Sequence, residues 1–188
     1  INSKEEERDI STEIRYKTED GKIIWVNSTY KVERNKQGEP IKVAGSSQDI
    51  TERKTNELVQ SAITRISEGA LTSKSMEGLI KSVHEAIEVI LPARNFYVAL
   101  YDPDTSIISF PYFADEYDTD WASRKLSRGL TSYVIRTGKP LRTSPEIFSE
   151  LEASGEVVND GIRNVDWLGV PLRSKQIVTG VIAIQTYD

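Results

Sequence analysis

Residues 49–54 read Asp-Ile-Thr-Glu-Arg-Lys, and at this point the hydrophobic pattern of the chain changes from that of strands to that of a helix. Before it, apolar residues alternate over residues 22–34, which is the period of a half-buried strand. After it, apolar residues recur at three- and four-residue spacing over residues 58–66, the period of an amphipathic helix. The stretch therefore predicts a sheet whose last strand runs directly into a helix.

Three strands are expected up to this point, with turn-forming residues between them. The Asp20-Gly21 pair is the strongest short hairpin signal, and residues 35–40 form a second turn cluster. A three-stranded meander of this size buries too little surface to be stable alone, so we expect either a missing part of the same domain or another surface to cover it. The predicted strands are Thr12–Glu19, Lys22–Arg34 and Ile41–Ile50.

The predicted helix begins after Asp49, whose distance from Glu52 is that of a capping box. Gly69 is expected to end or loosen this helix, because glycine disfavours a helix interior. The apolar stripe of the helix is compatible with packing on the following domain and with pairing with its own copy in a dimer. It is too short to choose between these two arrangements.

From residue 70 onward the order of elements is helix, two strands, two short helices and two strands, which is typical of an α+β fold with an antiparallel sheet. Pro92 is expected to stop the first of these helices, and Gly138 to end the second as a left-handed C′ residue. The expected elements are a helix over residues 75–91, strands Asn95–Tyr101 and Ile107–Phe113, helices Gly129–Thr137 and Pro145–Ala153, and strands Val165–Leu172 and Ile177–Tyr187.

The composition of the 188-residue chain argues against several functional classes. Its 29 acidic residues outnumber its 24 Lys and Arg residues, which argues against a nucleic-acid partner. The longest uncharged run, Gln176–Tyr187, is shorter than the ~18 residues that a membrane span needs, and no apolar signal segment opens the chain. The absence of cysteine excludes disulfides and thiolate chemistry, and a single histidine excludes multi-histidine metal sites. We therefore expect a cytoplasmic chain with no membrane segment, no catalytic residues and no metal site.

One order of residues in the first segment is specific. An Asp20-Gly21 hairpin is followed by Trp25-Val26, by Gly38 and Gly45, and finally by the stretch at 49–54. In this order they resemble the C-terminal half of a PAS sensory domain. The parts that build a PAS cofactor cavity would lie upstream of residue 1, so the resemblance implies no haem or flavin pocket. It implies that a change in the sheet tilts or rotates the helix, through a signal junction formed by Trp25, Asp49 and Thr51.

Further stretches follow in the second part of the chain. They are residues 95–102 (Asn-Phe-Tyr-Val-Ala-Leu-Tyr-Asp), 129–141, 167–172 (Trp-Leu-Gly-Val-Pro-Leu) and 180–184 (Gly-Val-Ile-Ala-Ile). In this order and spacing they resemble a GAF domain, which usually finishes with a helix that would lie beyond Asp188. Both ends of the chain are therefore expected to be cut from a longer sensor protein. The predicted domains are a PAS C-terminal half at 1–50, a linker helix at 51–69, and a GAF domain without its final helix at 70–188.

Two features invite a chemical role, and a structural interpretation is preferred for each. His84-Glu85 has the arrangement of a histidine-kinase phosphoacceptor site, but the chain contains no glycine-rich ATP-binding motif, so we expect a structural histidine. The loop Asp115–Trp121 carries four carboxylates, which suit calcium. It lacks the glycine turn and terminal glutamate of an EF-hand, so a solvated acidic loop is expected.

In GAF domains a small-molecule cavity lies between the sheet and the helices and loops over it. Alternation along residues 107–113 predicts that Phe110 and Tyr112 share one face. The resemblance implies that Tyr133 and Trp167 lie near the cavity, and the alternative is that these aromatic residues simply fill it. The chain contains no cysteine for a covalently attached bilin and no cyclic-nucleotide signature, so the only expected cofactor is an unknown small ligand. The candidate pocket residues are Phe110, Tyr112, Tyr133 and Trp167.

The sequence thus predicts a sensory and relay fragment rather than an enzyme. The resemblance implies a parent sensor histidine kinase of a two-component phosphorelay, with an output kinase domain in the same chain and a homodimer formed through helices. The alternatives are an input module of a cyclic-di-nucleotide enzyme or of a transcription activator, and a ligand-free structural dimerisation unit.

Overall fold

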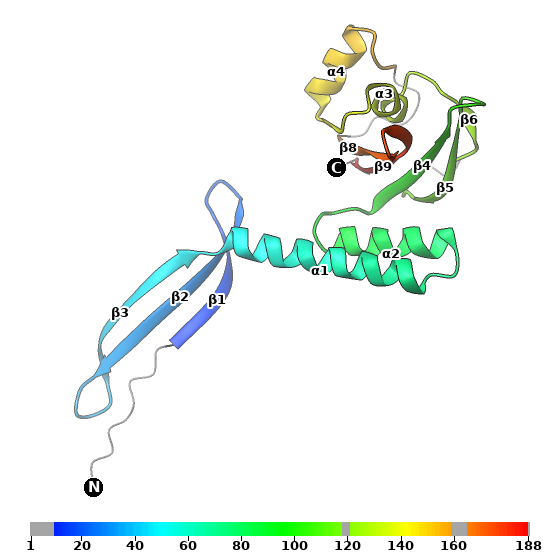
Figure 1. Cartoon of the computed structure of the whole chain (residues 1–188). Coiled ribbons are helices and arrows are strands. Elements are labelled where there is room, and N and C mark those ends of the chain that lie inside the picture. Colours follow the sequence, from blue (N-terminus) through cyan, green and yellow to red (C-terminus); the bar gives the residue numbers. More distant parts are fainter. Residues whose placement is uncertain (1–9, 118–120, 159–164, 188) are drawn as a thin grey trace. The chain divides into compact units, whose positions relative to one another are not determined.

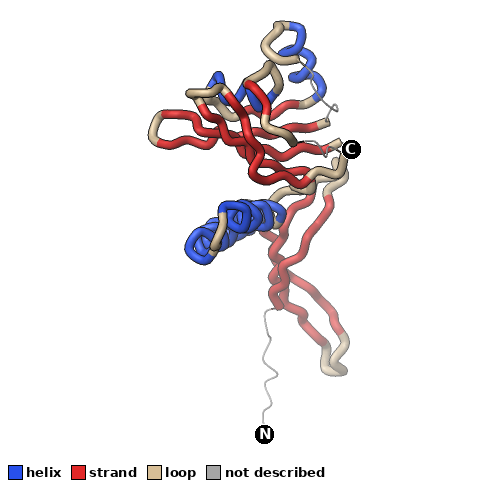
Figure 2. The backbone as a smooth tube through the Cα atoms, turned by 90° about the vertical axis from the view of Figure 1, so that its right-hand side faces the viewer, coloured by secondary structure: helices blue, strands red, loops and turns tan. Residues whose placement is uncertain are grey.

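The computed structural model describes residues 10–117, 121–158 and 165–187. The chain divides into two compact units, Ile1–Ser61 and Ala62–Asp188. The first unit contains a three-stranded sheet, and the second contains a six-stranded sheet (Figures 1 and 2). Both sheets are antiparallel, which confirms the predicted α+β class.

The first sheet has the strand order β1-β2-β3, and each predicted strand is present within two residues of its expected bounds. Gly21 and Gly38 adopt φ angles of +86° and +84° in its two turns, which glycine allows without strain. The strands are β1 (Ile10–Lys17), β2 (Ile23–Arg34) and β3 (Pro40–Asp49).

One face of this sheet is apolar, because residues that pair across the strands share a face. The pairs include Ile14 with Val26, and Val32 with Val43. Within the described chain, the side chains of Ile14 and Val43 remain 47% and 64% exposed. The sheet therefore presents apolar side chains to solvent, as expected for a meander that needs a cover.

Helix α1 (Thr51–Thr72) follows β3 after a single residue, Ile50, as the pattern at 49–54 predicts (Figure 1). The expectation that Gly69 ends the helix is wrong, since α1 continues to Thr72. Gly69 is buried, and a Cβ atom at this position would lie 2.8 Å from Cβ of Ser82. The glycine therefore lets α1 approach helix α2 (Met76–Glu88) closely.

The second sheet has the strand order β6-β5-β4-β9-β8-β7. Its long strands match the prediction, whereas the two edge strands β6 and β7 were not predicted. Strands of two and three residues are too short to show any periodicity. The strands are β4 (Asn95–Asp102), β5 (Ile107–Ala114), β6 (Arg124–Lys125), β7 (Leu141–Thr143), β8 (Asp166–Ser174) and β9 (Ile177–Thr186).

Helices cover both faces of this sheet, with α2 on one face and α3 (Leu130–Thr137) and α4 (Pro145–Ala153) on the other (Figure 1). Accordingly, the central strand β4 is apolar on both faces. Its Phe96 and Val98 pack in the cluster beneath α2, and Tyr97 and Ala99 pack in the cluster beneath α3. We call these two sides the α2 face and the α3 face.

The helix ends follow local capping chemistry. The Ser75 hydroxyl accepts a hydrogen bond from the Gly78 N–H and caps α2, and the Ser144 hydroxyl caps α4 in the same way through Ile147. Gly138 ends α3 in the left-handed conformation at φ +63°, as predicted. Helix α2 ends at Glu88, before the predicted residue 91, and a short turn leads into β4.

Candidate functional site

The predicted junction residues Trp25, Asp49 and Thr51 lie together where the first sheet meets α1. The backbone N–H of Trp25 donates a hydrogen bond to Thr51 Oγ1 at 2.9 Å, and the Trp25 carbonyl accepts one from Ile50 N–H at 2.8 Å. Asp49 Oδ1 accepts a hydrogen bond from Thr51 N–H at 2.8 Å, which satisfies one of the free N–H groups at the helix start. Hydrogen bonding by the Thr51 side chain, and then by its backbone N–H, lowers the pKa of this carboxyl. Strand β2 is therefore hydrogen-bonded both to Ile50, the residue between β3 and α1, and to Thr51, the first residue of α1.

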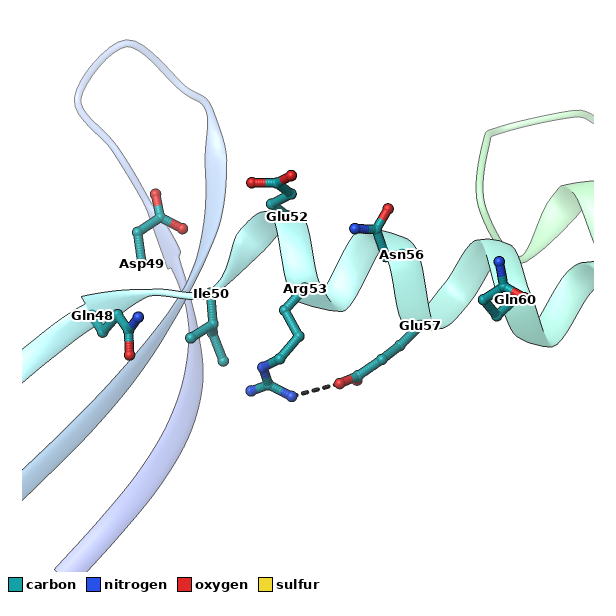
Figure 3. A pocket seen from close by; sticks show the side chains of 8 residues that line it. All are labelled: Gln48, Asp49, Ile50, Glu52, Arg53, Asn56, Glu57 and Gln60. Carbon is teal, nitrogen blue, oxygen red and sulfur yellow. Dashed lines mark hydrogen bonds and ion pairs between the residues drawn. The ribbon is translucent and has the colours of Figure 1, made fainter.

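An ion-pair cluster joins the first strand to the same helix turn. Glu13 of β1 pairs with Arg53 at 2.6 Å and with Lys54 at 2.6 Å. Arg53 also pairs with Glu57 at 2.5 Å along the helix (Figure 3). The hydrogen bonds from Lys54 and Arg53 hold the pKa of Glu13 below its ordinary value. All three strands of the sheet are therefore linked to the start of α1.

The indole of Trp25 lies on the same side of the sheet as Glu13, because odd-numbered residues of β1 and β2 share that face. Arg15 and Lys54 place their charged groups 5.8 Å and 5.5 Å from the ring centroid, within the range of a cation–π contact. The tryptophan therefore contacts a cation from the strand and a cation from the helix.

An open groove runs along the first turns of α1 beside this junction (Figure 3). All of its lining residues except Ile50 are polar, and two of them, Arg53 and Glu57, already bind each other. The residues that line it are Gln48, Asp49, Ile50, Glu52, Arg53, Asn56, Glu57 and Gln60.

The interior of the second unit holds a cluster of aromatic rings on the α3 face. Trp121 contacts Tyr97, Phe110 and Phe113, with ring centroids 4.7, 5.1 and 5.4 Å apart. Its neighbour Trp167 is 1% exposed, and its indole N–H donates to the Tyr97 hydroxyl at 3.0 Å. The Tyr97 hydroxyl also shares a hydrogen bond with Thr131 Oγ1 of α3 at 2.9 Å. The cluster is therefore aromatic, and a chain of hydrogen bonds from Trp167 through Tyr97 to Thr131 connects its neutral polar groups.

Comparison with known proteins finds a similarity for each part of the chain. Residues 2–47 match the family model described as PAS fold, and no curated protein matches the chain. Similar solved structures include the GAF domain of a phosphoenolpyruvate-protein phosphotransferase from Acinetobacter, with TM-score 0.54 and 15% identity over 72% of this chain and 78% of that one. The free methionine-R-sulfoxide reductase from Neisseria meningitidis, solved in complex with its substrate, has TM-score 0.55 and 12% identity over 71% and 75%. A methyl-accepting chemotaxis protein, residues 122 to 287, has TM-score 0.51 and 16% identity over 68% and 83%.

Matches that cover about 70% of the chain must include at least half of the second unit, because the first holds only residues 1–61. The second unit has the GAF fold. The fold alone does not separate a sensor from an enzyme, since the reductase shares it with the domains of the other two proteins.

The structure brings two of the four predicted pocket residues of the GAF unit together. Phe110 and Trp167 both belong to the cluster on the α3 face. Tyr133 is half-buried and lies under the guanidinium of Arg136 at 5.9 Å, whereas Val134 and Ile135 fill the core side of α3. In the described chain, Tyr133 is not among the side chains that pack in the aromatic cluster.

The prediction that Tyr112 shares a face with Phe110 is wrong. Tyr112 packs on the α2 face, where its hydroxyl is 3.0 Å from His84 Nδ1. The pairing of β5 with β4 shifts by one residue between these two positions, so the simple alternation of strand faces fails there. Because a bulge depends on the partner strand, the sequence of β5 alone does not reveal it.

His84 is buried, as the structural interpretation predicts, and both ring nitrogens have partners. Nε2 donates to the Ala93 carbonyl at 2.6 Å, and the ring stacks on Phe96 at 4.4 Å. Of the acidic loop, Asp118 and Asp120 lie outside the described residues. Asp115 accepts hydrogen bonds from Gln185 and Tyr187, and no cluster of three potential metal ligands occurs among the described residues.

Three residues of these sites were missed by the sequence analysis. Glu13 carries no motif and becomes a junction residue only through strand pairing. Tyr97 and Thr131 meet across the interior of the GAF unit, 34 positions apart. The alternation along β4 could have placed Tyr97 on the α3 face, but not opposite Thr131.

In the described part of the chain, no helix has both the length and the apolar character to cross a bilayer.

Proposed function

We propose that this chain is a sensory and relay segment of a signalling protein. In this proposal the GAF unit binds a small ligand or a protein partner, and the change passes through helices to an output domain. The PAS-fold match at 2–47, the GAF fold and the similarity to a methyl-accepting chemotaxis protein support it. We further propose a cytoplasmic parent protein with a histidine-kinase output and a homodimer formed through helices. A cyclic-di-nucleotide enzyme or a transcription activator is the alternative output.

The observation that carries the relay is the pair of hydrogen bonds between Trp25 and residues 50 and 51. A single residue of β2 holds the strand end through its carbonyl and the helix start through its N–H. A displacement of β2 therefore moves the first turn of α1 with it. Glu13 adds a second link from β1, through Arg53 and Lys54.

The chemistry of the α3 face sets the class of ligand that we propose. The clustered side chains are neutral, and the polar groups among them include the hydroxyls of Tyr97 and Thr131 and the indole N–H of Trp167. One cation, the guanidinium of Arg124, lies 4.9 Å from the Phe110 ring centroid. If a cavity opens beside them, such side chains suit a small, flat, uncharged molecule that stacks on an aromatic ring and binds a hydroxyl.

The test is to purify the chain under native conditions and to examine it by native mass spectrometry and thermal unfolding. We expect a co-purified small molecule, or an added one from a panel of planar neutral compounds, to raise the melting temperature. A ligand at 100 times its Kd adds about 2.7 kcal/mol of stability. Tyr97→Phe should weaken this effect, and Tyr117→Phe, which changes an exposed hydroxyl, is the matched control.

A second candidate is a structural dimerisation unit without a ligand. The near-complete burial of Trp167 (1% exposed) and Tyr97 (5% exposed) favours it, because these rings occupy the interior themselves. A dimer in native mass spectrometry, with no bound molecule and no compound in the panel that raises the melting temperature, would support this candidate against sensing.

A further inference from the structure

A β-bulge in β5 lies directly below the aromatic cluster of the GAF unit. Leu100 of β4 pairs with Ser109, and Val98 pairs with Tyr112. Phe110 and Pro111 therefore both lie opposite the single residue Ala99, which defines a bulge. Proline fits there, since it has no N–H to donate to the strand ladder.

The extra residue places Phe110 and Tyr112, which are two positions apart, on opposite faces of the sheet. Phe110 and Phe113 lie on the α3 face, where both rings contact Trp121. Tyr112 lies between them in sequence and points to the α2 face, where its ring packs against Phe96 at 5.8 Å. A shift of this short segment therefore changes contacts on both faces.

The contact of Tyr112 with α2 is a hydrogen bond whose direction depends on a proton. The Ala93 carbonyl can only accept, so His84 Nε2 carries a hydrogen and Nδ1 of the neutral ring accepts from the Tyr112 hydroxyl. If Nδ1 gains a proton, it becomes a donor, and the Tyr112 hydroxyl must turn to become the acceptor. The hydroxyl orientation thus has two discrete states.

The charged groups near this pair are on α2. Glu88 lies 3.8 Å from His84 Nε2, and Glu85 and Glu77 act on Tyr112 at longer range. The sheet presents the uncharged ring of Phe96, and the turn before β4 presents the Ala93 carbonyl. Burial and then these carboxylates raise the pKa of Tyr112, so its hydroxyl stays protonated at neutral pH.

We propose that the bulge at residues 110–113 couples the two faces of the GAF sheet, so that protonation of His84 shifts Trp121 through Tyr112. By thermodynamic reciprocity, a ligand that displaces Trp121 changes the His84–Tyr112 bond and hence the position of α2. The inference goes beyond the proposed function, because the coupling exists whether or not a ligand binds.

The test changes the pH and follows the ring protons of His84, which are easily assigned because the chain has only one histidine. The chain is labelled with 5-fluorotryptophan, and its three fluorine resonances are assigned with Trp25→Phe, Trp121→Phe and Trp167→Phe. The pH is then lowered from 8 to 5 while the His84 ring protons are followed by proton NMR. We expect the Trp121 resonance to shift with the same midpoint as His84, while the Trp25 resonance stays constant.

Two variants separate coupling through Tyr112 from a general effect of pH. In His84→Gln, which keeps an amide donor for Ala93, the Trp121 transition should disappear. In Tyr112→Phe the Trp121 resonance should no longer shift as the pH is lowered. Ile80→Val, which alters the same α2-face cluster but not the hydrogen bond, should leave the transition intact.

Two results would overturn the coupling. One is a Trp121 transition that is equally large in Tyr112→Phe. The other is a Trp121 resonance with the same chemical shift in the wild type, in Tyr112→Phe and in His84→Gln at every pH. This second comparison is informative even if His84 does not change its protonation state between pH 8 and pH 5. If His84→Gln fails to fold, Tyr112→Phe decides alone. A negative result for the coupling does not contradict ligand binding by the GAF unit. Likewise, a search that finds no ligand does not contradict the coupling.

Discussion

At Thr51 a single hydroxyl oxygen links the start of α1 to the sheet, and its removal is a direct test of the junction. Thr51→Val keeps the shape of the side chain but leaves the Trp25 N–H without its acceptor. We expect the free energy of unfolding to fall by about 1 kcal/mol and the Trp25 amide to exchange faster with solvent. Thr55→Val is the control, because its hydroxyl donates only to the exposed Thr51 carbonyl. Equal effects of the two variants would contradict a special role for Thr51.

Gly169 tests the packing of Trp167 in the same way. A Cβ atom at residue 169 would lie 2.0 Å from the Trp167 ring, so the ring must move when alanine is introduced. We expect Gly169→Ala to cost about 1–3 kcal/mol, as overpacked cores do, and to shift Trp167 fluorescence to longer wavelength. Val170→Ala, at a half-exposed neighbouring position, should change neither measurement much. An unshifted emission in Gly169→Ala would show that the ring is not fixed by this contact.

Among the elements, the start of α1 is held by carboxylates, and this makes its stability depend on pH. Bonds from Lys54, Arg53 and Thr51 lower the pKa of Glu13, Asp49 and Glu57 in the folded chain. A lowered folded pKa means that each group stabilises the fold above the ordinary carboxyl pKa of about 4, and that this stabilisation is lost as the pH falls further.

We therefore expect the amide protection of residues 51–54 to fall between about pH 5 and pH 3. Glu13→Gln should reduce this dependence, because it removes the strand partner of Arg53 and Lys54. Glu19→Gln, in the exposed turn after β1, is the matched control. Hydrogen exchange measured at several pH values gives the comparison, and an identical profile in all three proteins would refute the contribution of Glu13.

The close approach of α1 and α2 depends on Gly69. Alanine favours a helix by up to about 1 kcal/mol over glycine, but its Cβ would lie 2.8 Å from Cβ of Ser82. We expect the clash to prevail, so that Gly69→Ala destabilises the chain by about 1–3 kcal/mol. In a Ser82→Gly background the same change should become neutral or stabilising. Denaturant unfolding of the four proteins measures the coupling, and simple additivity would contradict the contact.

At the scale of the molecule, the first sheet exposes apolar side chains within the described part of the chain. Since Ile14 and Val43 are already about half exposed or more, polar replacements at these positions cost little burial. We expect Val43→Thr and Ile14→Thr to change stability by less than about 0.5 kcal/mol while reducing the binding of a hydrophobic dye. A concentration-dependent loss of stability in either variant would instead indicate that another copy covers this face.

The sequence by itself determined those features that depend on neighbours along the chain. The stretch at 49–54 indicated the strand-to-helix junction, although Asp49 accepts a hydrogen bond from Thr51 N–H, the first residue of α1, rather than forming the predicted capping box with Glu52. The turn glycines, the cap at Gly138 and the long strands were likewise predictable, because local backbone conformation and hydrophobic period set them.

Only the tertiary structure decided the features that depend on distant partners. The bulge in β5 arises from pairing with β4 and sends Tyr112 to His84 rather than to Phe110. The meeting of Tyr97 with Thr131, and of Glu13 with Arg53, likewise joins residues more than 30 positions apart. Period and propensity describe one segment at a time, whereas register and face are set by the strand or helix against which that segment packs.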